Sequence, residues 1–226
     1  MKKFNLFHNY PKKLNYRTVN IKKRNIYHKI LATNRSKIFF DGTRPFGYGG
    51  YNYDGRWIPI ARSLIKKFKL KNNSKILQIN CEKGYLLHDL KILNKTFKVY
   101  GIETSSYAKS KAKKNIKKNI KILKNYTSLG FKKNYFDFVI CLGAISYHGL
   151  KDALILIKEI QRVTKGKSFI NFASYKTKKD YWLIRDWTVL GNCILHEEEW
   201  KKVMKFLKYK GHYNFINTQS LNLKRK

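Results

Sequence analysis

The stretch of sequence that decides the fold is residues 76–86, which read I-L-Q-I-N-C-E-K-G-Y-L. Its apolar run Ile76–Ile79 is typical of a buried strand, and Gly84 is followed by leucines at helical spacing. A strand that passes through a turn directly into a helix leaves free backbone N–H groups at the helix N-terminus, where an anionic group can bind. The sequence therefore predicts a ligand-binding turn at residues 80–84.

Short apolar runs and helical patterns continue to alternate downstream of this turn. Further strands are predicted at residues 97–102, 120–123, 136–142, 167–174 and 213–216, and helices after Ser105-Ser106 and over 152–163, 177–190 and 196–211. This β-α-β-α-β order predicts a parallel sheet with right-handed crossovers and helices on both faces.

The composition is strongly basic, with 50 Lys+Arg against 13 Asp+Glu in 226 residues and a formal net charge of +37. The chain is 43% hydrophobic and 15% aromatic, enough to bury a core despite the charge. Such a charge attracts nucleic acid and other anions, but lysine enrichment is equally typical of A/T-rich codon usage, and both readings stay open. We divide the chain into a basic N-terminal extension (1–40), which lacks any acid and is the candidate contact for nucleic acid, a domain (41–217) and a basic tail (218–226).

Cysteine usage and hydropathy favour a protein of the reducing cytoplasm. Three cysteines without a C-x-x-C pair do not form a disulfide framework. The longest uncharged stretch, residues 138–150, is far shorter than the roughly 20 residues of a membrane-spanning helix. No His/Cys/Asp cluster has metal-ligand spacing, so no metal is predicted. The sequence does not determine the oligomeric state.

An acidic residue, Glu103, ends the second predicted strand of this region, where a carboxylate can accept hydrogen bonds from both hydroxyls of a ribose. With these features residues 38–217 resemble the class I S-adenosylmethionine-dependent methyltransferases. The resemblance lies in ILQINCEKGYLL, VYGIETSSYA, FDFVICLGAISYH, ALILIKEIQRV and EEEWKKVMKFLKYKGHYNFI. Residues 39–57, FFDGTRPFGYGGYNYDGRW, are similar to a bacterial subgroup found among surface-polysaccharide and other small-molecule pathways.

The resemblance implies a three-layer Rossmann-like α/β fold with a mostly parallel seven-stranded sheet and an antiparallel last strand. It implies methyl transfer from S-adenosyl-L-methionine to a small molecule, with a sugar or glycan precursor as the first candidate. Two alternatives remain: a nucleic-acid (RNA) methyltransferase, and a non-catalytic descendant of the fold with a degenerate cofactor loop.

The resemblance also implies cofactor-binding roles, carried over position by position. Gln78 stands where the family has an acid that receives the methionine amine, Glu103 fits the ribose acid, and Asn125 stands where an Asp commonly holds the adenine amino group. The full set is Arg56, Gln78, Asn80, Cys81, Gly84, Glu103, Thr104, Asn125, Tyr126 and Leu142.

Three positions depart from the family pattern in the loop. Gln78 keeps an acceptor but loses the charge that pairs with an ammonium group. Asn80 and Glu82 replace glycines, and Asn tolerates a left-handed backbone better than other residues. The Glu82 carboxylate would repel the cofactor's own carboxylate unless it turns outward or pairs with Lys83.

Methyl transfer needs alignment of the two reactants, and a base only where the acceptor is a hydroxyl or a protonated amine. We take Tyr51, in the expected lid of residues 47–57, and His148, past the fourth strand, as the catalytic candidates. The alternatives are an aromatic residue that packs the lid and a loop histidine. Trp182, Asp186 and Trp187 are either substrate-facing or core residues.

Overall fold

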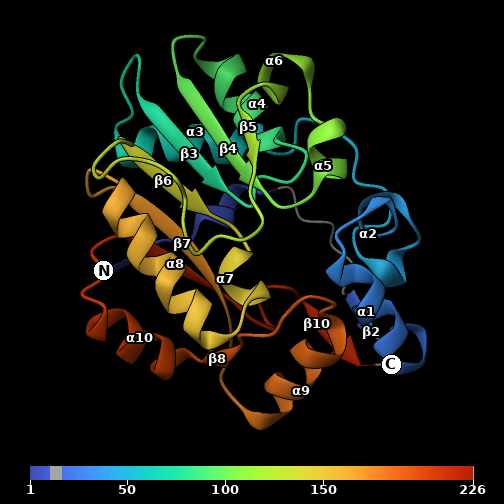
Figure 1. The fold of residues 1–226 in the computed structure, drawn as a ribbon. Helices are drawn as coiled ribbons and strands as arrows, with labels where there is room; N and C mark the ends of the chain where they lie inside the picture. The colour runs from blue at the N-terminus through green and yellow to red at the C-terminus, as the bar shows by residue number, and fades with distance from the viewer. Residues whose placement is uncertain (11–16, 226) are drawn as a thin grey trace.

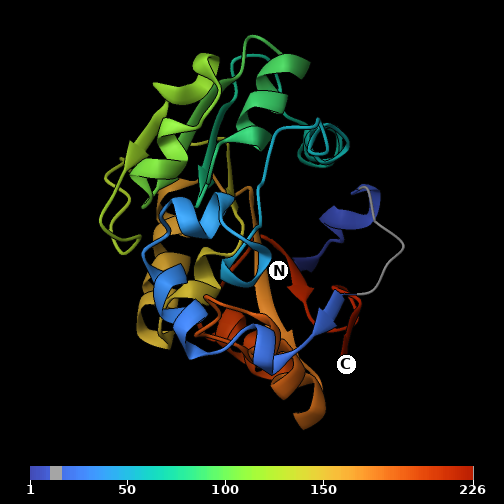
Figure 2. The same ribbon diagram turned by 90° about the vertical axis from the view of Figure 1, so that its right-hand side faces the viewer.

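The computed structural model describes residues 1–10 and 17–225 (Figures 1 and 2). Its strands are β1 (Lys2–Lys3), β2 (Arg17–Val19), β3 (Lys75–Ile79), β4 (Lys98–Glu103), β5 (Ile120–Ile122), β6 (Phe138–Cys141), β7 (Ser168–Tyr175), β8 (Leu195–His196), β9 (His212–Ile216) and β10 (Leu223–Arg225). The α-helices are α1 (Ile26–Thr33), α2 (Lys37–Asp41), α3 (Ile58–Phe68), α4 (Tyr85–Leu93), α5 (Ser106–Ser110), α6 (Lys114–Lys117), α7 (Ala144–Tyr147), α8 (Leu150–Val163), α9 (Lys178–Trp187) and α10 (Glu197–Phe206). Three 3-10 helices complete the set: η1 (Leu6–Asn9), η2 (Ile21–Lys23) and η3 (Arg44–Phe46).

The main sheet has the strand order β1-β9-β7-β6-β3-β4-β5, and β8 pairs with β7. Helices α3 and α4 pack on one face through a cluster that includes Leu64, Leu87 and Phe138. Helices α8 and α10 pack on the other through a cluster that includes Val139, Ile157 and Trp200. Because both faces are covered, the central strands are apolar along their length rather than alternating. The expected three-layer, mostly parallel α/β fold is confirmed.

The last strand of the main sheet differs from the antiparallel strand that the resemblance predicts. β9 runs parallel to β7, with Phe169 opposite His212 and Ala173 opposite Ile216. The physical reason is the crossover: α10 carries the chain back to the starting end of the sheet, and such a connection joins parallel strands. An antiparallel strand would need a hairpin after Ile216. The chain instead leaves the sheet, and β10 pairs with β2 in a separate two-stranded sheet.

Both ends of the chain contribute to this architecture. β1 adds to the sheet edge beside β9, with Lys2 opposite His212. Leu6 in η1 is buried in the same cluster as α3. The extension expected at 1–40 and the tail expected at 218–226 therefore both supply strands that pair with the rest of the protein, while residues 11–16 and 226 lie outside the described part.

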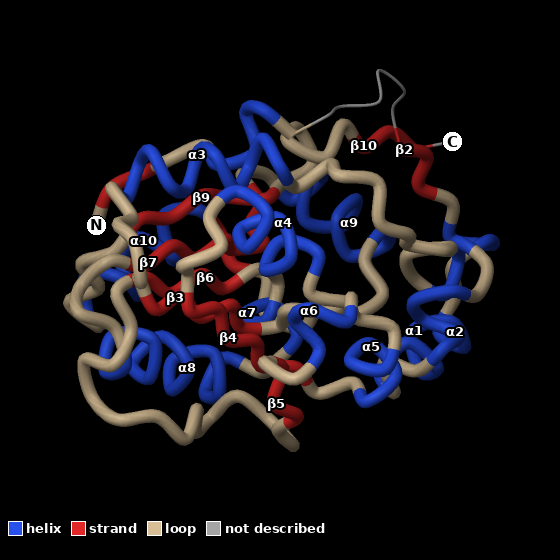
Figure 3. Tube along the Cα trace, turned by 90° about the horizontal axis from the view of Figure 1, so that it is seen from above, coloured by secondary structure: helices blue, strands red, loops and turns tan. Residues whose placement is uncertain are grey.

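The chain enters the middle of the sheet at β3, builds outward through β4 and β5, and then returns to build the other side from β6 (Figure 3). The carboxyl ends of β3 and β6 therefore form the topological switch point, where doubly wound sheets bind their ligands. The predicted turn at residues 80–84 lies there. Helices α1 and α2 lie beside this edge, near α5 (Figure 1).

No helix among the described residues is both long enough and apolar enough to cross a membrane. The three cysteines are free and buried.

Candidate functional site

The turn after β3 has a left-handed backbone at every second residue. The φ angles are 58° at Asn80, 54° at Glu82 and 70° at Gly84. At Gly84 a Cβ atom would lie 2.5 Å from the Ile116 side chain, so that position requires glycine. A left-handed conformation costs a residue with a Cβ roughly 1–2 kcal/mol, and Asn least. The chain thus keeps the backbone of a glycine-rich turn at two positions that carry side chains.

Two buried amide side chains lie at the start of this turn. Asn80 Nδ2 donates to the Leu142 carbonyl over 2.8 Å, which ties the end of β3 to the end of β6. Asn80 Oδ1 accepts from the Tyr126 hydroxyl at 3.3 Å. Gln78 is only 4% exposed, and its Oε1 has no hydrogen-bond partner among the described residues. An unpartnered buried acceptor costs about 1–3 kcal/mol, so this atom is suited to a donor from a ligand.

Glu82 turns to a tyrosine rather than to the neighbouring lysine. Its carboxylate accepts a hydrogen bond from the Tyr48 hydroxyl. Lys83 Nζ instead donates to Asp41 Oδ1 at 2.6 Å and to the Tyr51 carbonyl at 2.8 Å. Burial raises the pKa of Glu82 to about 7, against the opposing effect of Arg35. The suggested pairing of Glu82 with Lys83 is therefore wrong.

Glu103, the predicted ribose acid, is fully buried at the end of β4. Its Oε2 accepts from the Glu82 backbone N–H at 2.7 Å. Its Oε1 accepts from the backbone N–H groups of Thr104 at 2.8 Å and Ser105 at 3.0 Å. Arg35 Nη2 donates to the same Oε1 over 2.7 Å and forms a salt bridge. Both oxygens of the carboxylate are thus engaged within the protein.

Arg35 reaches this carboxylate from the segment between α1 and α2. The residue is 7% exposed, and its guanidinium lies 5.3–5.4 Å from the ring centres of Phe39, Phe40 and Tyr147. Its Nε and Nη1 atoms are buried and have no partner among the described residues. Sequence reasoning missed Arg35, because no motif marks it and its partner lies 68 positions away.

The residues predicted for the adenine side are already engaged. Asn125 is exposed, and its Oδ1 accepts from the Thr127 backbone N–H at 3.1 Å and hydroxyl at 2.7 Å, which closes a turn. Tyr126 is 2% exposed and points its hydroxyl toward Asn80. The acceptor that would hold the adenine amino group is therefore part of a local turn in this arrangement. Cys81 is buried, and burial raises the pKa of its thiol well above the ordinary value.

The lid residues contact one another more than they contact the turn. Trp57 Nε1 donates to the Tyr51 hydroxyl. Arg56 pairs with Asp54, with Nε to Oδ1 at 2.7 Å, and its guanidinium lies 5.4 Å from the Tyr51 ring. The predicted ligand contact of Arg56 thus has an acidic partner in the lid already. Tyr51 contacts the turn through its carbonyl, which accepts from Lys83.

His148 packs edge-on against Tyr126, with ring centres 5.5 Å apart. Its Nε2 is buried without a partner among the described residues, and burial lowers the pKa of the ring while Asp152 opposes that shift. Neutral His148 is the favoured form near pH 7, because its ordinary pKa of about 6.5 is already below that value.

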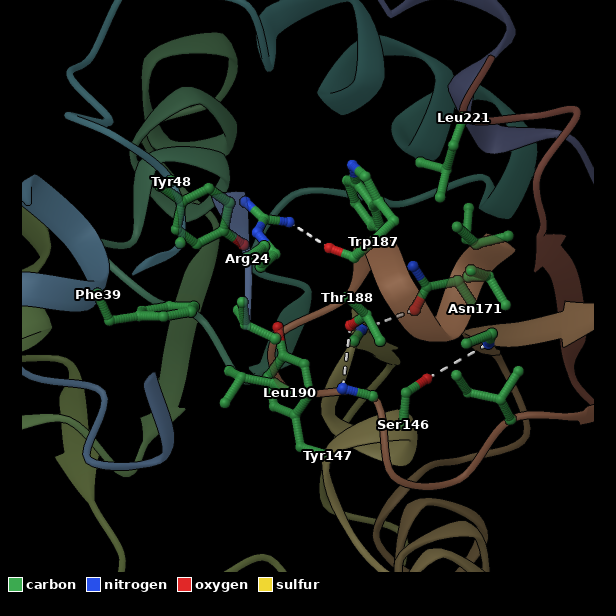
Figure 4. A pocket seen from close by; sticks show the side chains of 18 of the residues that line it. Arg24, Phe39, Tyr48, Ser146, Tyr147, Asn171, Trp187, Thr188, Leu190 and Leu221 are labelled. Carbon is green, nitrogen blue, oxygen red and sulfur yellow. Dashed lines mark hydrogen bonds between the residues drawn. The ribbon is translucent and has the colours of Figure 1, made fainter. Parts of the chain in front are cut away.

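A cavity of about 220 Å³ lies beside the turn, enclosed by the segment between α2 and the lid, the carboxyl ends of β6 and β7, and α9 (Figure 4). Its wall is largely apolar: Phe39, Gly47, Tyr48, Gly143, Tyr147, Ala173, Ile184, Trp187, Val189, Leu190, Gly191, Ile194, Ile216 and Leu221. The polar members are Arg24, Arg44, Ser146, Asn171 and Thr188. Tyr48 connects the cavity to the turn, because it lines the cavity and donates to Glu82.

The three substrate-side candidates, Trp182, Asp186 and Trp187, lie at different places relative to the cavity. Trp187 lines it, whereas Trp182 is 60% exposed and Asp186 pairs with Arg225 over 2.6 Å. Neither Tyr51 nor His148 lines it. Asn171, which sequence reasoning missed, accepts from the Gly143 N–H at 2.7 Å, and its polar position within an apolar strand was the available signal. Within the described ranges no group of His, Cys, Asp and Glu side chains could hold a metal.

Residues 77–172 match a family model described as a methyltransferase domain. The matched segment runs from β3 into β7 and includes the turn at residues 80–84. No curated protein matches the sequence at a significant level.

Among solved structures, the YcgJ protein of Bacillus subtilis is 16% identical, with a TM-score of 0.53, over 65% of this chain and 66% of its own. A proposed methyltransferase of Bacillus halodurans C-125 is 14% identical, with a TM-score of 0.52, over 65% and 67% of the two chains. The [4+2]-cyclase SpnF is 15% identical, with a TM-score of 0.52, over 70% and 61%. At these identities the likeness establishes the fold, and the matched part spans about two-thirds of each of these proteins.

Proposed function

We propose that this chain is an S-adenosylmethionine-dependent methyltransferase that acts on a small molecule held in the cavity beside the turn. The observation that carries the proposal is the turn itself. It keeps a left-handed backbone at Asn80, Glu82 and Gly84 within the segment that matches the methyltransferase-domain model. A chain with no use for a close backbone approach at this turn would gain stability by relaxing Glu82 to an ordinary conformation.

The residues present fit the cofactor at the turn. The unpartnered Gln78 Oε1 is an acceptor for its amino group, and the Glu103 carboxylate is an acceptor for its ribose hydroxyls. When bound, the cofactor would supply an electrophilic methyl group, carried on its sulfonium, for transfer to a nucleophilic acceptor. Asn80 holds the end of β3 against the end of β6, which fixes the edge at which the two reactants meet.

Glu103 is available to a ribose only after Arg35 has moved, because both of its oxygens already accept hydrogen bonds. The displacement has a compensation within the site. Two nitrogen atoms of the Arg35 guanidinium, Nε and Nη1, are buried without partners among the described residues, and they gain hydrogen bonds on reaching water or a ligand.

The chain's own part in the reaction is then positioning and exclusion of water rather than proton transfer. Tyr51 and His148 do not line the cavity, and burial raises the pKa of Tyr147, which does, to about 12. A group with that pKa is a poor base near pH 7. We therefore expect an acceptor that is nucleophilic without deprotonation. A sugar hydroxyl fits less well, because it reacts only after losing its proton. The polar oxygens of the cavity are also engaged already: Ser146 Oγ, Asn171 Oδ1 and Thr188 Oγ1 each accept a hydrogen bond from a backbone N–H group.

Isothermal titration with S-adenosylhomocysteine and S-adenosylmethionine tests the proposal. We expect binding to the wild type, weakened at least tenfold by Glu103→Ala and little changed by His148→Ala. Arg35→Met is expected to bind more tightly than the wild type, since the guanidinium no longer competes with the ribose for Glu103. Arg62→Gln, which removes one positive charge from an exposed position on α3, is the matched control for the overall field. Absence of binding to the wild type at millimolar cofactor rejects the proposal.

A non-catalytic descendant of the fold is the second candidate, and the buried Arg35–Glu103 salt bridge favours it. If that salt bridge has replaced the ribose in the native protein, the wild type will not bind the cofactor and Arg35→Met, which frees the carboxylate, will bind it. The same titration therefore separates the two candidates.

A further inference from the structure

The cavity contains positive charge without negative charge. Arg24 and Arg44 both line it, and none of the acidic residues that the structure describes does. Arg24 donates to the carbonyls of Pro45 at 3.1 Å, Arg44 at 2.7 Å and Trp187. Arg44 donates to the carbonyls of Gly47 at 2.6 Å and Tyr48 at 3.2 Å. These bonds fix both guanidinium groups in place but leave their charges unneutralised, because a carbonyl carries no net charge.

The surroundings of the cavity add to this charge. The Arg17 and Arg24 guanidinium groups lie 6.0 and 5.9 Å from the Trp187 ring, and Arg185 donates to the carbonyl of Gly191 at 2.8 Å. The nearby acid Asp186 is already paired with Arg225. No salt bridge within the described part of the chain involves Arg17, Arg24, Arg44 or Arg185.

The grouping of arginines at this cavity is distinct from the general excess of lysine in the chain. The sequence has nine arginines, of which Arg17, Arg24, Arg44 and Arg185 lie at or beside this one cavity. Guanidinium groups bind carboxylates through paired, directional hydrogen bonds, which the ammonium groups of lysine do not provide. Burial, together with the charge of Arg44, lowers the pKa of Arg24 to about 10, as expected of a cation that lacks an anion.

We propose that the cavity binds a small carboxylic acid whose body is apolar and about the size of one six-membered ring. A cavity of about 150 Å³ holds benzene, and this one, at about 220 Å³, leaves room for a ring and a short side chain. The aromatic and aliphatic wall, which includes Phe39, Tyr48 and Trp187 (Figure 4), covers the body. The guanidinium groups of Arg24 and Arg44 are the counter-charge for the carboxylate. That such an acid is also the methyl acceptor rests on the proposed function; that it binds does not.

Isothermal titration without cofactor tests the binding, with 3-phenylpropanoate, its uncharged amide 3-phenylpropanamide, and glucose as probes. We expect the acid to bind at least tenfold more tightly than the amide and glucose not to bind. Arg44→Gln should reduce the acid-to-amide ratio by about tenfold, the usual effect of one charge-assisted hydrogen bond. Arg44→Lys, which keeps the charge, should retain most of the ratio, and Arg62→Gln should leave it unchanged. Arg44 is exposed, so its replacement should not prevent folding, and Arg24→Gln gives a second measurement at the cavity.

Equal affinity for acid and amide, no binding of the acid at millimolar concentration, or an equal loss in Arg62→Gln would overturn the inference. An acid preference in a protein that does not bind S-adenosylhomocysteine would reject the proposed function and leave the cavity assignment standing. Cofactor binding without an acid preference would reject the cavity assignment and leave the proposed function standing.

Discussion

The Arg35–Glu103 salt bridge makes a quantitative prediction about stability. Its atoms are 2.7 Å apart, and the two side chains are 8% and 0% exposed. Removing one member of a buried pair typically costs 3–5 kcal/mol, because the other is left as an uncompensated charge. Arg35→Met keeps an apolar side chain against Phe39, Phe40 and Tyr147, so the lost packing is small.

Two features of the site reduce that cost. Glu103 keeps the three backbone N–H donors that it already has. The substitution also removes two buried donor nitrogens that have no partner among the described residues, and each such group costs about 1–3 kcal/mol. We therefore expect Arg35→Met to lower the free energy of unfolding by about 2 kcal/mol, which for a chain of this size corresponds to roughly 4–8 °C in Tm.

A double-mutant cycle with Glu103→Gln isolates the pair. We expect Glu103→Gln alone to cost about 3 kcal/mol, since it leaves the guanidinium buried without an anion. The double variant should cost about 2 kcal/mol less than the sum of the single changes, as measured by urea unfolding at pH 7. If the two single changes in the free energy of unfolding add up to that of the double variant within about 0.5 kcal/mol, the reasoning is refuted, because the two charges then have no interaction energy.

Other predictions concern the turn. Gly84→Ala should lower the free energy of unfolding by about 2–3 kcal/mol in urea, because a left-handed residue gains a Cβ against Ile116; a loss below about 0.5 kcal/mol would contradict the turn geometry. Burial raises the pKa of Glu82 to about 7, from about 4.3 in the unfolded chain. The free energy of unfolding of the wild type should therefore fall as the pH rises from about 4.3 to about 7, and this carboxyl group should cause no further change above pH 7. The Tm of Glu82→Gln minus that of the wild type should accordingly grow from pH 5 to pH 7, and a difference that stays constant with pH would count against the buried carboxylate.

The central strands were predictable from sequence because they are buried on both faces. The observed bounds agree within one or two residues with the predicted apolar runs for four strands: β3, β4, β6 and β7. The turn was predictable from a change of pattern, because Gly84 follows an apolar strand run and precedes leucines at helical spacing. Its contact with the second strand, from the Glu82 N–H to Glu103, joins two elements that the sequence already placed as neighbours.

What the sequence did not indicate depends on contacts between distant segments. Arg35 is indistinguishable from other basic residues until α1 and α2 pack against the sheet edge. The lysine-rich helix expected after Ser105 is interrupted at Lys113, where the backbone is extended, and forms α5 and α6 instead. Lysines spaced four apart, such as Lys109 and Lys113, destabilise a continuous helix. The direction of β9 was set by the crossover through α10, a feature of topology rather than of local pattern.

The pairing of β1 with β9 has a consequence for how this protein is made. Lys2 lies opposite His212, so a strand at the beginning of the chain completes the sheet only when a strand near its other end has formed. Contacts between residues so far apart in sequence form late, because a long loop must close first. During synthesis one edge of β7 therefore stays unpaired until β9 has been made, and an unpaired edge can pair with other chains until β9 and then β1 have joined the sheet.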